Sequence, residues 1–110
     1  MLSKAERREI LIDQIKTAKF MADKAIIENP SDNGSCNFDQ AMIKKEKWFT
    51  YAETIQIFKD CDLSANKYKN GWLLVGGIHG QAAKNTLWAK TFAKWLEEQG
   101  FESSMYYQLD

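Results

Sequence analysis

The sequence has one proline, one histidine and two cysteines, and its fifteen basic residues are balanced by fifteen acidic ones. Two cysteines do not make the disulfide framework of a small secreted domain, and the first residues of the chain lack the apolar core of a signal peptide. We therefore expect a cytoplasmic protein whose two thiols are reduced. The neutral charge balance removes the excess of positive charge that holds a nucleic-acid backbone, so duplex DNA is not an expected partner.

Long apolar runs and metal-ligand patterns are also missing from the sequence. No run approaches the roughly twenty apolar residues that cross a bilayer, so no membrane partner is expected. One histidine and two separated cysteines do not match the spacing of zinc ligands, and we predict neither a metal site nor a cofactor. What is present, 45% hydrophobic and 27% charged residues in a chain of 110, is typical of one globular domain covering residues 1–110.

A long N-terminal helix is predicted over residues 1–29. Ser3–Glu6 has the pattern of a capping box, and Pro30 ends the helix because the residue before a proline avoids helical angles. A narrow apolar stripe follows the helical spacing and consists mostly of small residues: Leu11, Ile15, Ala18, Ala22 and Ala25. We expect this stripe to lie across the domain's own sheet, and the alternative is that it forms the seam of a homodimer.

Residues 36–110 are predicted to form a β-α-β-α-β core. The expected elements are a strand over Cys36–Ile43, a helix from Thr50–Glu53 to near Asp60, a strand over Trp72–Ile78, a helix over Gln81–Gln99 and a strand over Ser103–Leu109. Strands separated by helices favour parallel pairing. The prediction is therefore an α/β fold with a small three-stranded sheet packed by helices, and the alternative is an antiparallel last strand.

The best candidate site is the glycine-rich bend after the strand at residues 72–78. A strand that ends in glycines before a helix directs backbone N–H groups and the positive end of the helix dipole at one anion. Lys84 would add a charge, Asn85 a directional hydrogen bond and Trp72 an aromatic surface for a base. The predicted ligand-binding residues are Gly76, Gly77, His79, Gly80, Gln81, Lys84, Asn85 and Trp72.

The function expected from this bend is the non-enzymatic binding of a phosphorylated small molecule or nucleotide. The alternative for the bend is a turn in which the glycines only permit close packing. A second function, binding of a protein partner as an inhibitor does, would use the first helix and the exposed aromatic residues Trp48, Tyr68 and Tyr106 or Tyr107. A third would use His79 as the acid or base of a small hydrolase or transferase. A lone histidine defines no reaction, so no catalytic residue is assigned.

Three parts of the sequence resemble small uncharacterised proteins of bacterial and phage genomes: Cys36–Asp39, Gly76-Gly77 with Gly80–Ala82, and Tyr106–Asp110. The resemblance covers about the last two thirds of the chain. It implies a stand-alone accessory protein, carried by a phage or another mobile element, that works by binding. By analogy with small phage proteins, it also implies an anti-defence role, in which a host nuclease is covered or a nucleotide signal is sequestered.

Overall fold

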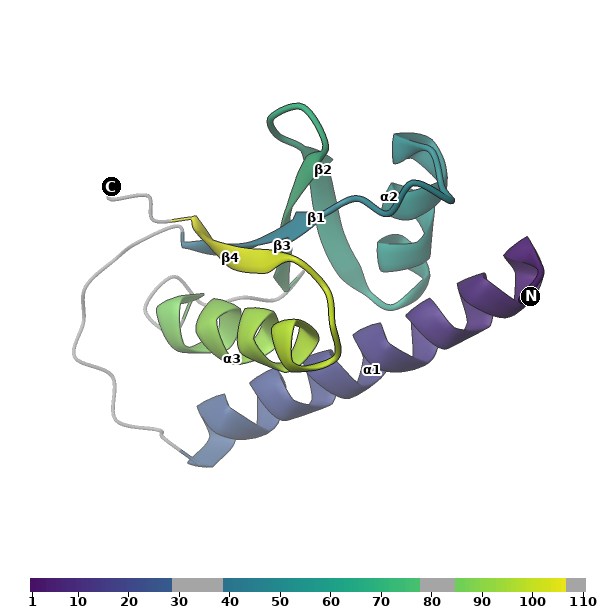
Figure 1. Ribbon diagram of the computed structural model, residues 1–110. Coiled ribbons are helices and arrows are strands. Elements are labelled where there is room, and N and C mark those ends of the chain that lie inside the picture. Colours follow the sequence, from purple (N-terminus) through teal and green to yellow (C-terminus); the bar gives the residue numbers. More distant parts are fainter. Residues whose placement is uncertain (29–38, 78–84, 107–110) are drawn as a thin grey trace.

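Three helices and one antiparallel sheet make up the computed structural model, which describes residues 1–28, 39–77 and 85–106 (Figure 1). In chain order the elements are α1 (Lys4–Glu28), β1 (Gln40–Lys44), α2 (Tyr51–Asp60), β2 (Leu63–Lys67), β3 (Trp72–Gly77), α3 (Asn85–Glu98) and β4 (Ser103–Tyr106). The predicted α/β class and the long first helix are confirmed. No helix in these ranges combines the length and the apolar composition needed to cross a bilayer.

The sheet has four strands in the described part of the chain, where the sequence predicted three. Their order is β2-β3-β1-β4, and every neighbouring pair is antiparallel. The prediction of parallel neighbours is wrong for a topological reason. The helices α2 and α3 do connect strands that point the same way, but β3 lies between β1 and β2, and β1 lies between β3 and β4. This is the split β-α-β connectivity of ferredoxin-like folds.

The strand that the sequence prediction missed is β2. Only Leu63 and Ala65 of its five residues are buried, and it contains none of the β-branched or aromatic residues that favour strands. Pairing with β3 makes this segment extended. Asp62, at φ 59°, lies between α2 and β2, and Gly71, at φ 89°, lies in the turn before β3.

One face of the sheet forms the core. The register places Ala41 opposite Val75 and Ile43 opposite Leu73, and all four side chains are buried. Against this sheet α3 packs on β1 and β4, while α2 packs on β2. The largest fully buried side chains come from helices and strands alike: Phe58, Phe92, Ile15, Ile57, Leu63, Leu73, Leu96 and Val75.

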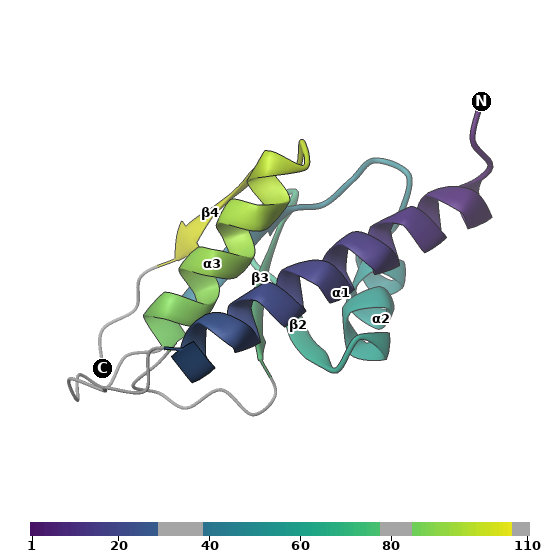
Figure 2. The ribbon, with the colours of Figure 1, turned by 90° about the horizontal axis from the view of Figure 1, so that it is seen from below.

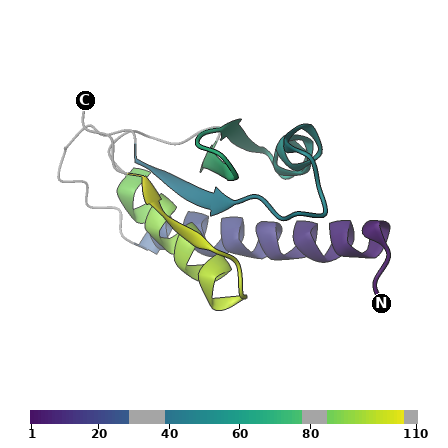
Figure 3. The same cartoon turned by 45° about the horizontal axis from the view of Figure 1, so that its top comes forward.

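The helix α1 runs along the whole molecule, with its N-terminal half near α2 and its C-terminal half beside α3 (Figure 1 and Figure 3). Four residues of the predicted stripe are buried: Leu11, Ile15, Ala18 and Ala22. The helix packs chiefly on α3, which lies beside it (Figure 2). The buried residues of α1 belong to the same core cluster as Leu73 and Val75 of the sheet. Because the stripe is covered inside its own domain, it is not available as the seam of a homodimer.

Small residues line the contact between α1 and α3. Ala18 and Ala22 of α1 and Ala89 of α3 are fully buried, and alanines allow helix axes to approach closely. One polar contact joins the same two helices, because the indole Nε1 of Trp88 donates to Asp23 Oδ1 at 2.8 Å. The Trp88 side chain is itself buried, so this hydrogen bond satisfies a donor that would otherwise lack a partner.

The ends of the helices follow the local signals in the sequence. Ser3–Glu6 and Thr50–Glu53 both form complete capping boxes, in which each hydroxyl oxygen accepts from the glutamate N–H at 3.1 Å. The stop of α3 is also as predicted: Gly100 has φ 96°, and the Phe101 N–H donates to the Leu96 carbonyl at 3.0 Å. Together with the bond from the Gly100 N–H to the Glu97 carbonyl, also at 3.0 Å, this bond forms a Schellman motif, which satisfies carbonyl groups at the end of the helix.

Replacing Ala22 with leucine is expected to destabilise the fold. Ala22→Leu adds a branched side chain at a fully buried position between helices, and overpacking of this kind costs about 1–3 kcal/mol. Urea unfolding followed by circular dichroism measures the difference. Lys16→Leu, at an exposed position of the same helix, is the matched control and should stay within about 0.5 kcal/mol of wild type. Equal stability of Ala22→Leu and wild type would contradict close packing at this position.

Candidate functional site

The glycine bend predicted from the sequence lies only partly within the described residues. Four of its predicted ligand-binding residues fall outside them: His79, Gly80, Gln81 and Lys84. Gly76 and Gly77 belong to β3, where they pair with Ser64 and Leu63 of β2. Asn85 is the first residue of α3. A strand before the bend and a helix after it are confirmed. The bend itself and the roles predicted for the four residues lie outside the described ranges and stay predictions.

Gly76 has a packing role in the sheet. A Cβ atom at this position would lie 3.3 Å from Gln40 Nε2 and 3.7 Å from Ser64 Oγ. The Ser64 hydroxyl also donates to the Gly76 carbonyl at 3.3 Å. Side chains from both neighbouring strands therefore approach Gly76, which agrees with the alternative that this glycine permits close packing.

Trp72 lies at the opposite end of β3 from the bend. It is the first residue of the strand and Gly77 is the last, a separation of roughly 17 Å at the usual rise of a strand. The indole ring instead lies beside Lys44, whose Nζ is 5.2 Å from the ring centroid. The structure therefore does not bring Trp72 together with Gly77, the last described residue before the bend.

The aromatic residues predicted to be exposed differ in their surroundings. Trp48 is 40% exposed, and the guanidinium carbon of Arg7 lies 3.8 Å from its ring centroid. Tyr68 and Tyr106 are partly buried and pack edge to face, with centroids 5.0 Å apart. Tyr107 lies outside the described residues. Of the described members of this set, Trp48 alone is an exposed aromatic surface.

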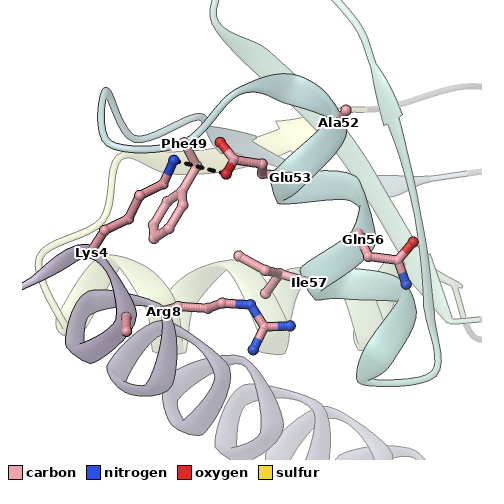
Figure 4. A pocket seen from close by; sticks show the side chains of 8 residues that line it. Lys4, Arg8, Phe49, Ala52, Glu53, Gln56 and Ile57 are labelled. Atoms are coloured by element: carbon pink, nitrogen blue, oxygen red, sulfur yellow. Dashed lines mark ion pairs between the residues drawn. The ribbon is translucent and has the colours of Figure 1, made fainter.

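A groove opens between the start of α1 and the N-terminal part of α2 (Figure 4). It has a volume of about 560 Å³ and is lined by Lys4, Ala5, Arg8, Phe49, Ala52, Glu53, Gln56 and Ile57. Figure 4 shows Phe49 and Ile57 pointing into the groove from the α2 side, opposite the long side chains of α1. These two apolar residues are only 3% and 1% exposed, so they form the apolar floor.

Ion pairs hold the rim of the groove. Lys4 Nζ lies 2.8 Å from Glu53 Oε2, and Arg8 Nη2 lies 3.0 Å from Asp60 Oδ2. Gln56 Nε2 donates to the other oxygen of Asp60 at 2.8 Å. All four ion-paired side chains are more than two fifths exposed, so the pairs add little to stability. Their effect is to fix the polar groups of α1 and α2 in position around the apolar floor.

Glu53 is the most strongly perturbed acid of this rim. Hydrogen bonding from Lys4, followed by hydrogen bonding from the Thr50 backbone N–H at 2.9 Å, lowers the pKa of Glu53 from about 4.5 to about 2. Both interactions favour the ionised carboxylate. Glu53 is therefore an anion at any physiological pH and cannot serve as a proton donor in the groove.

The other described groups whose pKa is shifted do not line the groove. Cys61 is a free, buried thiol, and burial raises its pKa, which keeps it protonated. Burial also raises the pKa of Glu46. Within the described ranges, no three His, Cys, Asp or Glu side chains come together as a metal site.

The sequence prediction placed none of the groove residues in a site. Residues 4–8 and 49–57 are far apart in the chain, and their meeting depends on how α1 lies along the domain. The only local signal was the capping box, which located Glu53 at the start of a helix but not opposite Lys4.

Anion binding at the glycine bend is a prediction that a thermal-shift assay tests. Inorganic pyrophosphate or ATP should raise the melting temperature, because a ligand that binds only the folded state stabilises it. Lys84→Ala should reduce the shift, whereas Lys90→Ala, an exposed lysine of α3, should not. The absence of a shift, or an equal shift in Lys84→Ala, would count against an anion site.

Removal of the Glu53 carboxylate is expected to change how stability depends on pH. The pKa of Glu53 is lower in the folded state, so its contribution is fully present above about pH 4.5 and is lost as the pH falls to about 2. The melting temperature of Glu53→Gln should lie below that of wild type at neutral pH, and the gap should close on acidification. In a Lys4→Met background the gap should be smaller. A gap that widens as the pH falls would contradict this origin of the pKa shift.

Comparisons of this chain with protein families, with characterised proteins and with solved structures find no match. The resemblance to small phage and bacterial proteins therefore stays a prediction from the sequence.

Proposed function

We propose that the protein binds a short segment of a partner polypeptide in the groove between α1 and α2, without catalysing a reaction. The observation that supports this proposal is the combination of an apolar floor with a fixed polar rim. A groove of about 560 Å³ lies within the range of known ligand sites, which are mostly apolar and contain a few well-placed polar groups. This space is large enough for one bulky side chain and its flanking backbone.

The apolar floor would provide most of the affinity. Full burial of a leucine or phenylalanine side chain contributes about 1.5–3 kcal/mol, and Phe49 and Ile57 would contact such a side chain from below. The aliphatic parts of Lys4 and Arg8 line the same groove and add apolar contact around a polar tip. A partner segment with one large apolar residue therefore fits this surface best.

The polar rim would provide specificity. Both cations of the lining, Lys4 and Arg8, are paired with a carboxylate, so the groove has no strong preference for one sign of charge. The side-chain amide of Gln56 and the exposed edges of the ion pairs can hydrogen-bond to the peptide groups of an extended segment. Trp48 precedes the floor residue Phe49, and its exposed ring extends the surface that a partner could cover.

A role as an inhibitor would use this surface directly, because an inhibitor only has to cover a partner. An inhibitor role, including the anti-defence role implied by the resemblance to phage proteins, would depend on the same groove. Binding of a phosphorylated ligand at the glycine bend would be a separate activity, and the Lys84 experiment tests it independently.

A random peptide library displayed on phage tests the proposed function. Selection on the wild-type protein should enrich sequences that share one large apolar residue between polar ones. Ala52→Phe places a ring in the groove at an exposed position, and it should weaken binding of the selected peptides by about tenfold or more, a change of about 1.4 kcal/mol.

Lys94→Phe is the matched control, because it adds the same ring at an exposed position of α3. It should bind the selected peptides as wild type does. The proposal is overturned if no peptide is enriched, or if Ala52→Phe binds the enriched peptides with unchanged affinity.

A further inference from the structure

The outer face of α1 carries a second regular pattern, separate from the buried stripe. Its residues recur at alternating steps of three and four: Ile10, Asp13, Thr17, Phe20, Lys24 and Ile27. This is the spacing of a coiled-coil seam. All six residues are exposed, and Ile10, Phe20 and Ile27 are 44%, 64% and 76% exposed.

This outer seam faces away from the rest of the domain. Seen from below, α1 crosses the molecule with no other described element over it (Figure 2). The buried residues Leu11, Ile15, Ala18 and Ala22 lie on the opposite side of the same helix. A surface helix of a monomer normally has one apolar face and one polar face. Because α1 has apolar residues on its outer face as well as on its buried face, the outer face has the composition of an interface.

We infer that α1 pairs antiparallel with α1 of a second copy of this chain through the outer seam. In one antiparallel register the six residues form three kinds of layer. Ile10 lies opposite Ile27 of the second copy, Asp13 opposite its Lys24, and Thr17 opposite its Phe20. The two-fold symmetry repeats each layer, so no seam residue lacks a counterpart.

The charges of the seam select this direction. In the antiparallel register Asp13 meets a lysine, so opposite charges pair across the interface at two places. A parallel pair in register would place Asp13 against Asp13 and Lys24 against Lys24, and both contacts are repulsive. Within the described residues neither side chain forms an ion pair in the single chain, so both are available to a second copy.

The polar atoms of the seam can be covered at low cost. The Thr17 hydroxyl already donates to the Asp13 carbonyl at 2.9 Å, so covering Thr17 leaves no unpaired donor. The seam spans residues 10–27, about 26 Å of helix. One helix face of this length is smaller than the roughly 800 Å² per partner of a standard interface, so the dimer should form in the micromolar range or above.

This inference goes beyond the proposed function and uses a different part of α1. The groove involves the first turns of the helix, whereas the seam begins at Ile10 on its outer side. Ala52→Phe should therefore leave dimerisation unchanged, and Phe20→Glu should leave peptide binding unchanged. The two proposals can fail independently.

Sedimentation equilibrium of the full chain up to millimolar concentration tests the pairing. Wild type should show a reversible monomer–dimer equilibrium. Asp13→Lys and Lys24→Asp should each weaken the dimer by about tenfold or more, because each creates two like-charge contacts. The double variant Asp13→Lys/Lys24→Asp should restore the wild-type dissociation constant to within about threefold, since it exchanges the two charges and keeps both pairs.

Lys94→Asp, an exposed charge reversal on α3, is the matched control and should dimerise as wild type does. Circular dichroism confirms that each variant is folded. The inference is overturned by a strict monomer at millimolar concentration, by a dimer that Phe20→Glu leaves unchanged, or by a double variant that does not regain affinity.

Discussion

The packing of α1 on α3 is the contact on which the other features of the molecule depend. One side of α3 packs on β1 and β4, and α3 also makes the main contact with α1. Because α1 lies along α3, its first turns reach α2 and form one wall of the groove. The same placement leaves the outer side of α1 open. A single helix contact, lined by Ala18, Ala22 and Ala89, thus creates both surfaces to which we assign binding.

Features that depend on nearby residues were predictable from the sequence. The capping boxes at Ser3–Glu6 and Thr50–Glu53 and the stop at Gly100 are satisfied by hydrogen bonds within five residues, so local patterns located them. The buried stripe of α1 was also found from its spacing. The contact of α1 with α3 was not predicted, because periodicity shows which side of a helix is apolar and not which elements lie against it.

Features that depend on contacts between distant residues could not be predicted from the sequence. The strand β2 has little strand propensity and is extended because it pairs with β3. The sheet is antiparallel because β3 lies between β1 and β2, and β1 lies between β3 and β4. The groove combines Lys4 with Glu53, which are joined only by tertiary packing. The predicted glycine site was an inference from local order alone, and it included Trp72, which the length of β3 separates from the bend.

The split connectivity has a consequence for how the chain is made. β1 pairs with β3 on one side and β4 on the other, so Ala41 meets both Val75 and Met105. A nascent chain on the ribosome therefore exposes both edges of β1, and the apolar stripe of α1, until nearly the whole domain has been translated. Closure over such sequence separations is slow compared with local helix formation. Protection of these surfaces during synthesis, by a chaperone or by rapid collapse, is thus a requirement built into the topology.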